Sequence, residues 1–108
     1  MIFGRRFPLI TVNIKFLLYL ESSPELSIGK KVVPVELEDG ATFGGFLSEI
    51  ESNFGADVAD VIYDPRAQSL QEMVRAIVNG VLVHNLHGVD TVLQQGDDII
   101  FVPFVMGG

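Results

Sequence analysis

The stretch "IIFVPFV" at residues 99–105 constrains the fold most, because it holds no polar residue. Side chains alternate between the two faces of a strand, which would put Ile99 and Phe101 on one face and Ile100 and Val102 on the other. Apolar residues on both faces are typical of a strand at the centre of a sheet, covered by protein on both sides. The chain's own helix can cover one face, and the other face needs a further segment or a partner protein.

Other stretches of the chain also have strand patterns. Residues 9–20 alternate polar and apolar side chains in their first half, which predicts a half-buried strand. "VVPVELE" predicts a second strand, in which Pro34 favours an edge position or a bulge. "VRAIVNGVLV" at 74–83 predicts a β-hairpin that turns at Asn79-Gly80. The first and last strands are the most apolar, so we expect them side by side at the centre of the sheet.

One main helix is predicted between the second strand and the hairpin. Thr42 is a typical N-cap, and Gly55 is a typical end for a helix that reaches about residue 54. Apolar residues repeat along one face of this helix with the 3.6-residue period: Phe43, Phe46, Leu47, Ile50 and Phe54. Gly44 and Gly45 in the first turn weaken the helix and indicate close packing against another backbone segment.

Residues 56–72 carry the weakest pattern. We expect a short helical turn in "ADVADVIY" and a mobile loop in "RAQSLQEM", and this segment is one candidate cover for the second face of the last strand. The order of elements predicts an α+β fold, a mixed sheet of four to five strands packed on one main helix. The chain of 108 residues is expected to form a single domain, 1–108, with 1–9 as an N-terminal extension and 105–108 as a flexible C-terminal tail.

Composition excludes several classes of function. The chain has no cysteine, so disulfides, thiolate metal sites and cysteine nucleophiles are excluded, which fits a reducing cytoplasm. Fourteen acidic and seven basic residues give a net charge of -7, the wrong sign for binding nucleic acid. Asn13 and Lys15 interrupt a stretch that is already too short to span a bilayer, so we expect no membrane segment. The acidic excess after residue 31 would speed the approach of a basic protein partner.

The last residues of the chain could carry a carboxylate that another enzyme activates. A C-terminal carboxylate is ionised at neutral pH and can attack the α-phosphate of ATP. Four extended residues, 105–108, reach at most ~14 Å. Gly107 and Gly108 have no side chains, so this end can pass through a narrow channel into the active site of another protein.

The residues just before the glycines would contact the partner. Val105 and Met106 could fill side pockets along a groove, while an extended backbone gains hydrogen bonds there. Pro103 and Phe104 lie where the last strand gives way to the tail. Phe104 is our first choice for an apolar contact with the partner, although an aromatic residue on a strand is more often part of the core.

Three stretches carry a family resemblance: "VELEDGATFGGFLSEI", "VNGVLV" and "GVDTVLQQGDDIIFVPFVMGG". In this order they resemble the MoaD/ThiS-like sulfur carriers, typified by the small subunit of molybdopterin synthase and by the thiamine sulfur carrier. The resemblance implies the β-grasp (ubiquitin-like) fold. The molybdopterin carriers commonly end in two prolines, an aliphatic residue, a small residue and Gly-Gly. Here Phe104 occupies the position of the second proline and Met106 that of the small residue. These differences bear on which pathway receives the sulfur more than on the chemistry of the tail.

The same resemblance implies a function as the small subunit of molybdopterin synthase, in the biosynthesis of the molybdenum or tungsten cofactor. An E1-like adenylating enzyme would use ATP to adenylate Gly108, and a sulfurtransferase would supply sulfur to form a thiocarboxylate. A larger molybdopterin synthase subunit would then hold the tail while sulfur moves to a pterin precursor. The domain would bind no cofactor and would catalyse nothing alone.

Several alternatives stay open at this point. The chain could serve the thiamine pathway or another sulfur pathway, could be a ubiquitin-like protein modifier whose tail joins lysines, or could be an interaction domain with an inert tail. His84 and His87, with Asp90, have the residue types of a metal site, but we expect ordinary solvated histidines because one loop rarely supplies a converging ligand set. Asp97 and Asp98 are explained by turn chemistry.

Overall fold

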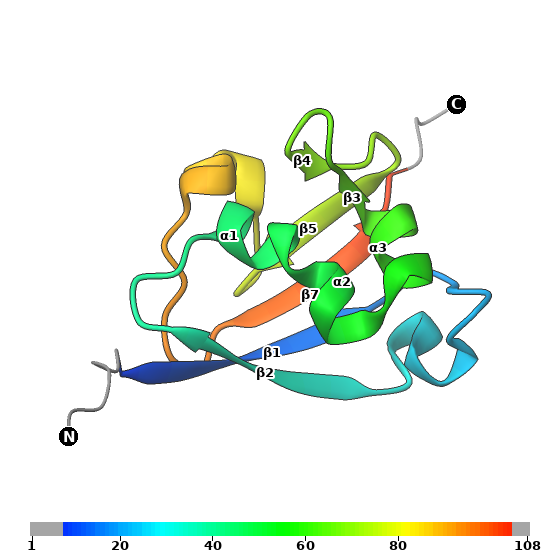
Figure 1. The fold of residues 1–108 in the computed structure, drawn as a ribbon, viewed down its shortest axis with the longest axis horizontal. Helices are drawn as coiled ribbons and strands as arrows, with labels where there is room; N and C mark the ends of the chain where they lie inside the picture. The colour runs from blue at the N-terminus through cyan, green and yellow to red at the C-terminus, as the bar shows by residue number, and fades with distance from the viewer. Residues whose placement is uncertain (1–7, 105–108) are drawn as a thin grey trace, which may run out of the picture.

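A five-stranded sheet forms the framework of the molecule. The computed structural model describes residues 8–104, and its main sheet has the strand order β2-β1-β7-β5-β6 (Figure 1). The strands are β1 (Leu9–Phe16), β2 (Val32–Glu38), β5 (Val74–Val78), β6 (Val81–Leu82) and β7 (Asp98–Pro103). β1 and β7 are parallel and the other pairs are antiparallel, so the sheet is mixed. The predicted pairing of the first and last strands at the centre is confirmed.

Short helices and turns connect these strands. The helices are α1 (Phe43–Ser48), α2 (Ile50–Phe54) and α3 (Ala56–Ile62), and Figure 1 shows them following one another along the sheet. Three 3-10 segments are η1 (Pro24–Gly29), η2 (Val83–Asn85) and η3 (Gly88–Asp90). A separate two-stranded ribbon consists of β3 (Tyr63–Asp64) and β4 (Ser69–Leu70). The α+β class is therefore confirmed.

One hydrophobic core lies between the sheet and the helices. Alternate residues of β1 and β7 point into it, which leaves Phe16 and Phe101 without exposed surface. The two rings stack with centroids 5.4 Å apart, and Phe46 of α1 stacks on Phe101 at 6.3 Å. Burying an apolar side chain of this size contributes roughly 1.5–3 kcal/mol, so the stack fixes the helices on the central strands.

The predicted single helix is wrong in one respect, because it is broken at Glu49. Thr42 caps α1 as predicted, and its Oγ1 accepts a hydrogen bond from Gly45 N at 3.1 Å. Glu49 then leaves the helical region, with φ -111° and ψ 14°. Its N–H donates to Phe46 O, three residues back, and this tighter turn ends α1 before α2 begins.

Residues 56–72 are more regular than the sequence predicts. A full helix, α3, follows Gly55, where φ is 98°, in place of a single turn. α3 buries three residues in the main core: Val58, Ala59 and Ile62. Part of the predicted loop, Ser69–Leu70, forms β4 and pairs with β3, and Gln71 Nε2 donates to Tyr63 O at 2.9 Å, while the rest of residues 66–73 form turns or irregular structure. Since α3 packs into the core on the helix side, this segment does not cover the second face of β7.

Strand ends differ from the prediction by a few residues. β1 ends at Phe16 instead of residue 20, because the chain turns into η1, where the Oγ of buried Ser27 accepts a hydrogen bond from Leu20 N. β7 ends at Pro103, and residues 105–108 lie outside the described part of the chain. β1 begins at Leu9, so the extension predicted for 1–9 overlaps the first strand by one residue.

Turn residues behave as the sequence predicts. Asn79 and Gly80, with φ of 50° and 87°, connect β5 to β6. The Asn79 amide donates to Asp97 Oδ1 at 2.8 Å, and Asp97 Oδ2 accepts from Gln94 N at 2.8 Å. Asp97 is thereby a turn residue, as expected, and it ties the hairpin to the start of β7. Among residues 8–104, no helix has the length and apolar character needed to cross a bilayer.

Candidate functional site

The second face of the sheet is open and partly apolar. Ile100 and Val102 of β7 point away from the core and are only half-buried. Ile100 lies between Lys15 of β1 and Ile77 of β5 in the sheet register, and both of these neighbours are also half-buried. No helix in residues 8–104 contributes to this face, since α1, α2 and α3 all join the core on the other side. The apolar residues of β7 are thus available to a partner protein.

Arg75 borders this face where β7 ends. It lies opposite Val102 in the register of β5 and β7. Its guanidinium carbon is 3.9 Å from the centre of the Phe104 ring, the geometry of a cation–π contact. Its Nη1 donates to Glu72 O at 2.8 Å and to Val74 O at 3.0 Å. These contacts hold one cation in a fixed position beside the last described residue.

The structure fixes the point from which the tail leaves. Phe104 N donates to Met73 O at 2.8 Å, which continues the antiparallel ladder one residue beyond β7. Phe104 is half-buried beneath Arg75, and Pro103 is exposed. Phe104 therefore borders the open face, whereas Pro103 lies on the same side of β7 as Phe101, exposed at the end of the strand. The contact of both residues with a partner stays a prediction. The other predicted site residues are Val105, Met106, Gly107 and Gly108, and they lie outside the described residues.

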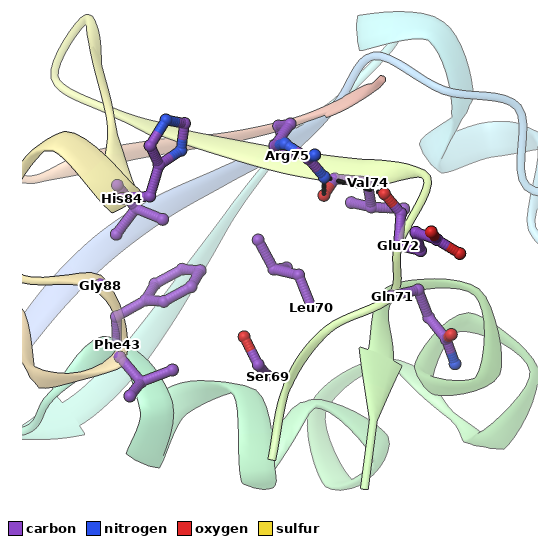
Figure 2. A pocket seen from close by; sticks show the side chains of 11 residues that line it. Phe43, Ser69, Leu70, Gln71, Glu72, Val74, Arg75, His84 and Gly88 are labelled. Atoms are coloured by element: carbon purple, nitrogen blue, oxygen red, sulfur yellow. Dashed lines mark hydrogen bonds between the residues drawn. The ribbon is translucent and has the colours of Figure 1, made fainter. Parts of the chain in front are cut away.

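A separate hollow lies at the edge of β5, on the helix side of the sheet. It has a volume of about 360 Å³ and is lined by residues from α1, the β4–β5 segment and the turns after β6. Figure 2 shows Phe43 and Leu70 inside it, with Arg75 and His84 on the side of β5. Its polar lining residues include Ser69, Glu72 and His84, and it shares Arg75 with the border of the open face. Within residues 8–104 no hydrogen bond joins the side chains of Ser69, Glu72 and His84 into a reactive set, so the open face stays the candidate site.

The histidines do not form a metal site. Both His84 and His87 are exposed, in the segment between β6 and β7. Within residues 8–104, no group of three or more histidine or carboxylate side chains is placed to hold a metal ion. Thr91 Oγ1 accepts a hydrogen bond from His87 N at 3.0 Å, so a threonine hydroxyl, and not a metal ion, holds this loop together.

The sequence matches the ThiS family over residues 28–108, a range that includes the open-face strands β5 and β7 and both terminal glycines. The chain belongs to the ThiS family. The family groups ubiquitin-like sulfur carriers and modifiers. No curated protein matches the sequence of this ThiS-family chain.

Solved structures confirm the β-grasp (ubiquitin-like) fold of this ThiS-family protein. The Haloferax volcanii HVO 2177 protein is 24% identical, with a TM-score of 0.69 over 97% of this chain and 98% of that one. The small archaeal modifier protein 1 of the same organism is 17% identical, with a TM-score of 0.67 over 89% and 99%. A putative molybdopterin converting factor, subunit 1, from Pyrococcus furiosus is 22% identical, with a TM-score of 0.58 over 89% and 99%. At these identities the likeness concerns the fold.

Two features of the site were missed by sequence reasoning. Arg75 and Phe104 are far apart in the sequence, and only the pairing of β5 with β7 brings them together. Ile28, in η1, has a large exposed apolar side chain at the same end of the sheet as Phe104. The sequence offered no signal that separates Ile28 from Leu26, an apolar residue of the same polar stretch that packs against the core.

Proposed function

We propose that this protein is a cytoplasmic sulfur carrier whose C-terminal Gly108 is charged by an E1-like adenylating enzyme. An oxygen of the Gly108 carboxylate attacks the α-phosphorus of ATP, which forms an acyl-adenylate and releases pyrophosphate. A hydrosulfide equivalent from a sulfurtransferase then attacks the acyl carbon and AMP leaves, which produces the thiocarboxylate. ATP is consumed by the partner, and the carrier itself holds no cofactor.

The observation that carries this proposal is the family match, which runs to residue 108. The fold adds a physical argument. β7 leads directly to the tail, and its outward side chains Ile100 and Val102 offer half-buried apolar surface beside that exit. A partner that receives the tail can therefore bind the body at the same time, in an interface of roughly 800 Å² on each side.

For the client, we propose molybdopterin synthesis, with this chain as the small subunit of the synthase. The likeness to the putative molybdopterin converting factor, subunit 1, of Pyrococcus furiosus supports this assignment. The Gly96-Asp97 turn before β7 and Pro103 near its end also match those carriers. A larger synthase subunit would then receive the thiocarboxylate and pass the sulfur to a pterin precursor.

Intact-protein mass spectrometry of the chain purified from its native host tests the proposal. We expect a fraction of the protein in which one C-terminal oxygen is replaced by sulfur, and we expect its formation in vitro to require ATP, the adenylating enzyme and a sulfur donor. A mass that stays unmodified under all of these conditions would contradict the proposal. Reconstitution with the larger synthase subunit and a pterin precursor then tests the client.

A protein modifier is the second candidate, favoured by the likeness to the small archaeal modifier protein 1. In that case the acyl-adenylate, or a thioester formed from it, is attacked by a lysine amine, and an isopeptide bond forms. Digestion of host proteins followed by peptide mass spectrometry distinguishes the two functions. Branched peptides that carry the C-terminal residues of this chain support a modifier.

A further inference from the structure

Ile28 combines an unusual backbone conformation with an exposed position. Its φ and ψ are 57° and 38°, in the left-handed region, and its side chain is 61% exposed. This region is a genuine outlier for a β-branched residue, and holding it there costs energy. Burial within residues 8–104 does not offset that cost. A large apolar side chain kept strained and solvent-facing indicates a contact beyond residues 8–104.

Hydrogen bonds hold the loop around Ile28 in place. Ile28 N donates to Leu18 O at 3.1 Å. The neighbouring Ser27 has no exposed surface, and its Oγ accepts from Leu20 N at 2.6 Å and lies 3.2 Å from both Leu20 O and Ser23 O. A side chain on a loop fixed in this way loses little conformational entropy on binding. Ile28 is therefore preorganised for insertion into a pocket.

Ile28 lies at the end of the sheet from which the tail leaves. Leu17, just after β1, donates its N–H to Phe101 O of β7 at 2.8 Å, and a Cβ on Gly29 would lie 2.9 Å from Leu17 Cδ2. η1 thus packs beside the end of β1, the parallel neighbour of β7, and Figure 1 shows η1 and the end of β7 at the same end of the sheet. Five exposed large apolar side chains lie at this end: Leu17, Tyr19, Ile28, Val32 and Met73.

Because the tail is short, an enzyme that binds its last residue must also contact the end of the sheet where η1 lies. Phe104 N donates to Met73 O, and under the proposed function the reacting carboxylate belongs to Gly108, four residues farther along the chain. Four extended residues span at most ~14 Å. An enzyme whose active site holds that carboxylate must therefore approach the body closely, at the end of the sheet where η1 lies.

We propose that Ile28 is an anchor that inserts into an apolar pocket of the E1-like adenylating enzyme. This inference rests on the proposed function, because such an enzyme binds the carrier only to charge Gly108. That enzyme is the partner that must bind the uncharged chain. Exposed Lys30 and Lys31 follow the anchor, and Lys15 Cδ would lie 3.6 Å from a Cβ on Gly29. Because these lysines surround Ile28, we expect carboxylates at the rim of the pocket on the adenylating enzyme.

Ile28→Gly tests the anchor, because glycine adopts positive φ without strain. We expect the melting temperature to stay level or to rise by about 2–5 °C as the strain is released. We expect the KM for the carrier in ATP–pyrophosphate exchange by the host's adenylating enzyme to rise about tenfold or more, since an anchor in a pocket dominates affinity. kcat should change less than about twofold, because Ile28 touches no reacting atom.

Three variants serve as controls. Ile28→Asn also tolerates positive φ and should repeat the effect of glycine. Ile28→Leu retains an apolar side chain and should keep most of the affinity. Val92→Ala removes a 49% exposed apolar side chain near the β5–β6 hairpin, away from the tail, and should leave KM unchanged.

The outcomes separate the two proposals. If the wild-type chain is charged and Ile28→Gly shows an unchanged KM, the anchor is wrong and the proposed function stands. The anchor is also wrong if both Ile28→Gly and Ile28→Asn lower the melting temperature, because the loop then needs isoleucine for its own structure. If the wild-type chain supports no ATP–pyrophosphate exchange, the proposed function fails and the anchor fails with it.

Discussion

At the scale of single residues, polar side chains decide where the chain turns. Ser27 is the clearest case, since it is completely buried in a stretch that otherwise reads as a solvated connection. Its hydroxyl satisfies Leu20 N, which has no strand partner after β1 ends. Asp97 likewise fixes the turn before β7, where its two carboxylate oxygens accept hydrogen bonds from the Asn79 amide and from Gln94 N.

Replacing Ser27 by alanine should destabilise the protein. The substitution leaves Leu20 N buried without an acceptor, which costs about 1–3 kcal/mol. Urea denaturation followed by circular dichroism measures the change in the free energy of unfolding. Ser22→Ala, at an exposed position in the same connection, should change it by less than about 0.5 kcal/mol. Equal effects of the two substitutions would contradict this role of the Ser27 hydroxyl.

At the scale of elements, close packing sets the position of α1. A Cβ added to Gly44 would lie 3.0 Å from both the Cβ and the backbone oxygen of Val89 in η3. A Cβ added to Gly45 would meet only Thr42 Oγ1, at 3.3 Å. The first turn of the helix can therefore rest against η3 only because residue 44 has no side chain.

Gly44→Ala should destabilise the fold although alanine favours helix. The clash with the Val89 backbone costs about 1–3 kcal/mol, against about 1 kcal/mol gained in helix propensity. Gly45→Ala is the matched control and should cost less than half as much. Thermal unfolding of the two variants measures the difference. A Gly44→Ala variant more stable than Gly45→Ala would show that α1 moves away from η3 without loss.

Elements with a strong period were predicted, and elements set by distant contacts were not. Alternating polar and apolar residues predicted β1, the unbroken apolar run at 99–105 predicted β7 as a central strand, and Asn79-Gly80 predicted the hairpin, because these signals are local. The break at Glu49 and the ribbon of β3 and β4 were missed, since two-residue strands are too short to show a period. At the site, Phe104 was predicted from its place beside the tail, while the covering Arg75 follows from strand pairing.

At the scale of the whole molecule, the sheet has one open face, and its two edge strands disfavour pairing with a further strand. Pro34 in the edge strand β2 has no N–H to offer to a further strand, and β6 at the other edge has only two residues. Addition of a partner strand is therefore disfavoured at both edges. Under the proposed function, partners meet the body at the open face and at the end of the sheet near Phe104.

Deleting Gly107 and Gly108 should separate charging from folding. Neither glycine has a side chain to bury, so we expect the free energy of unfolding to change by less than about 0.5 kcal/mol. Charging by the adenylating enzyme should be abolished, because the carboxylate then ends two residues short of the active site. Denaturation and mass spectrometry measure the two effects. Loss of the fold in the shortened chain would contradict the role given to the tail.

Because β7 ends beside Ile100 and Val102, every partner that receives the tail binds the same surface of the protein. Under the proposed function, the enzyme that loads the carrier and the subunit that unloads it compete for a single footprint, so a complex of all three is sterically ruled out. Each delivery then requires complete release of one partner before the next can bind. The rate of sulfur transfer in the cell would be limited by the rates at which the carrier dissociates from each partner, and a partner that binds too tightly would slow the transfer.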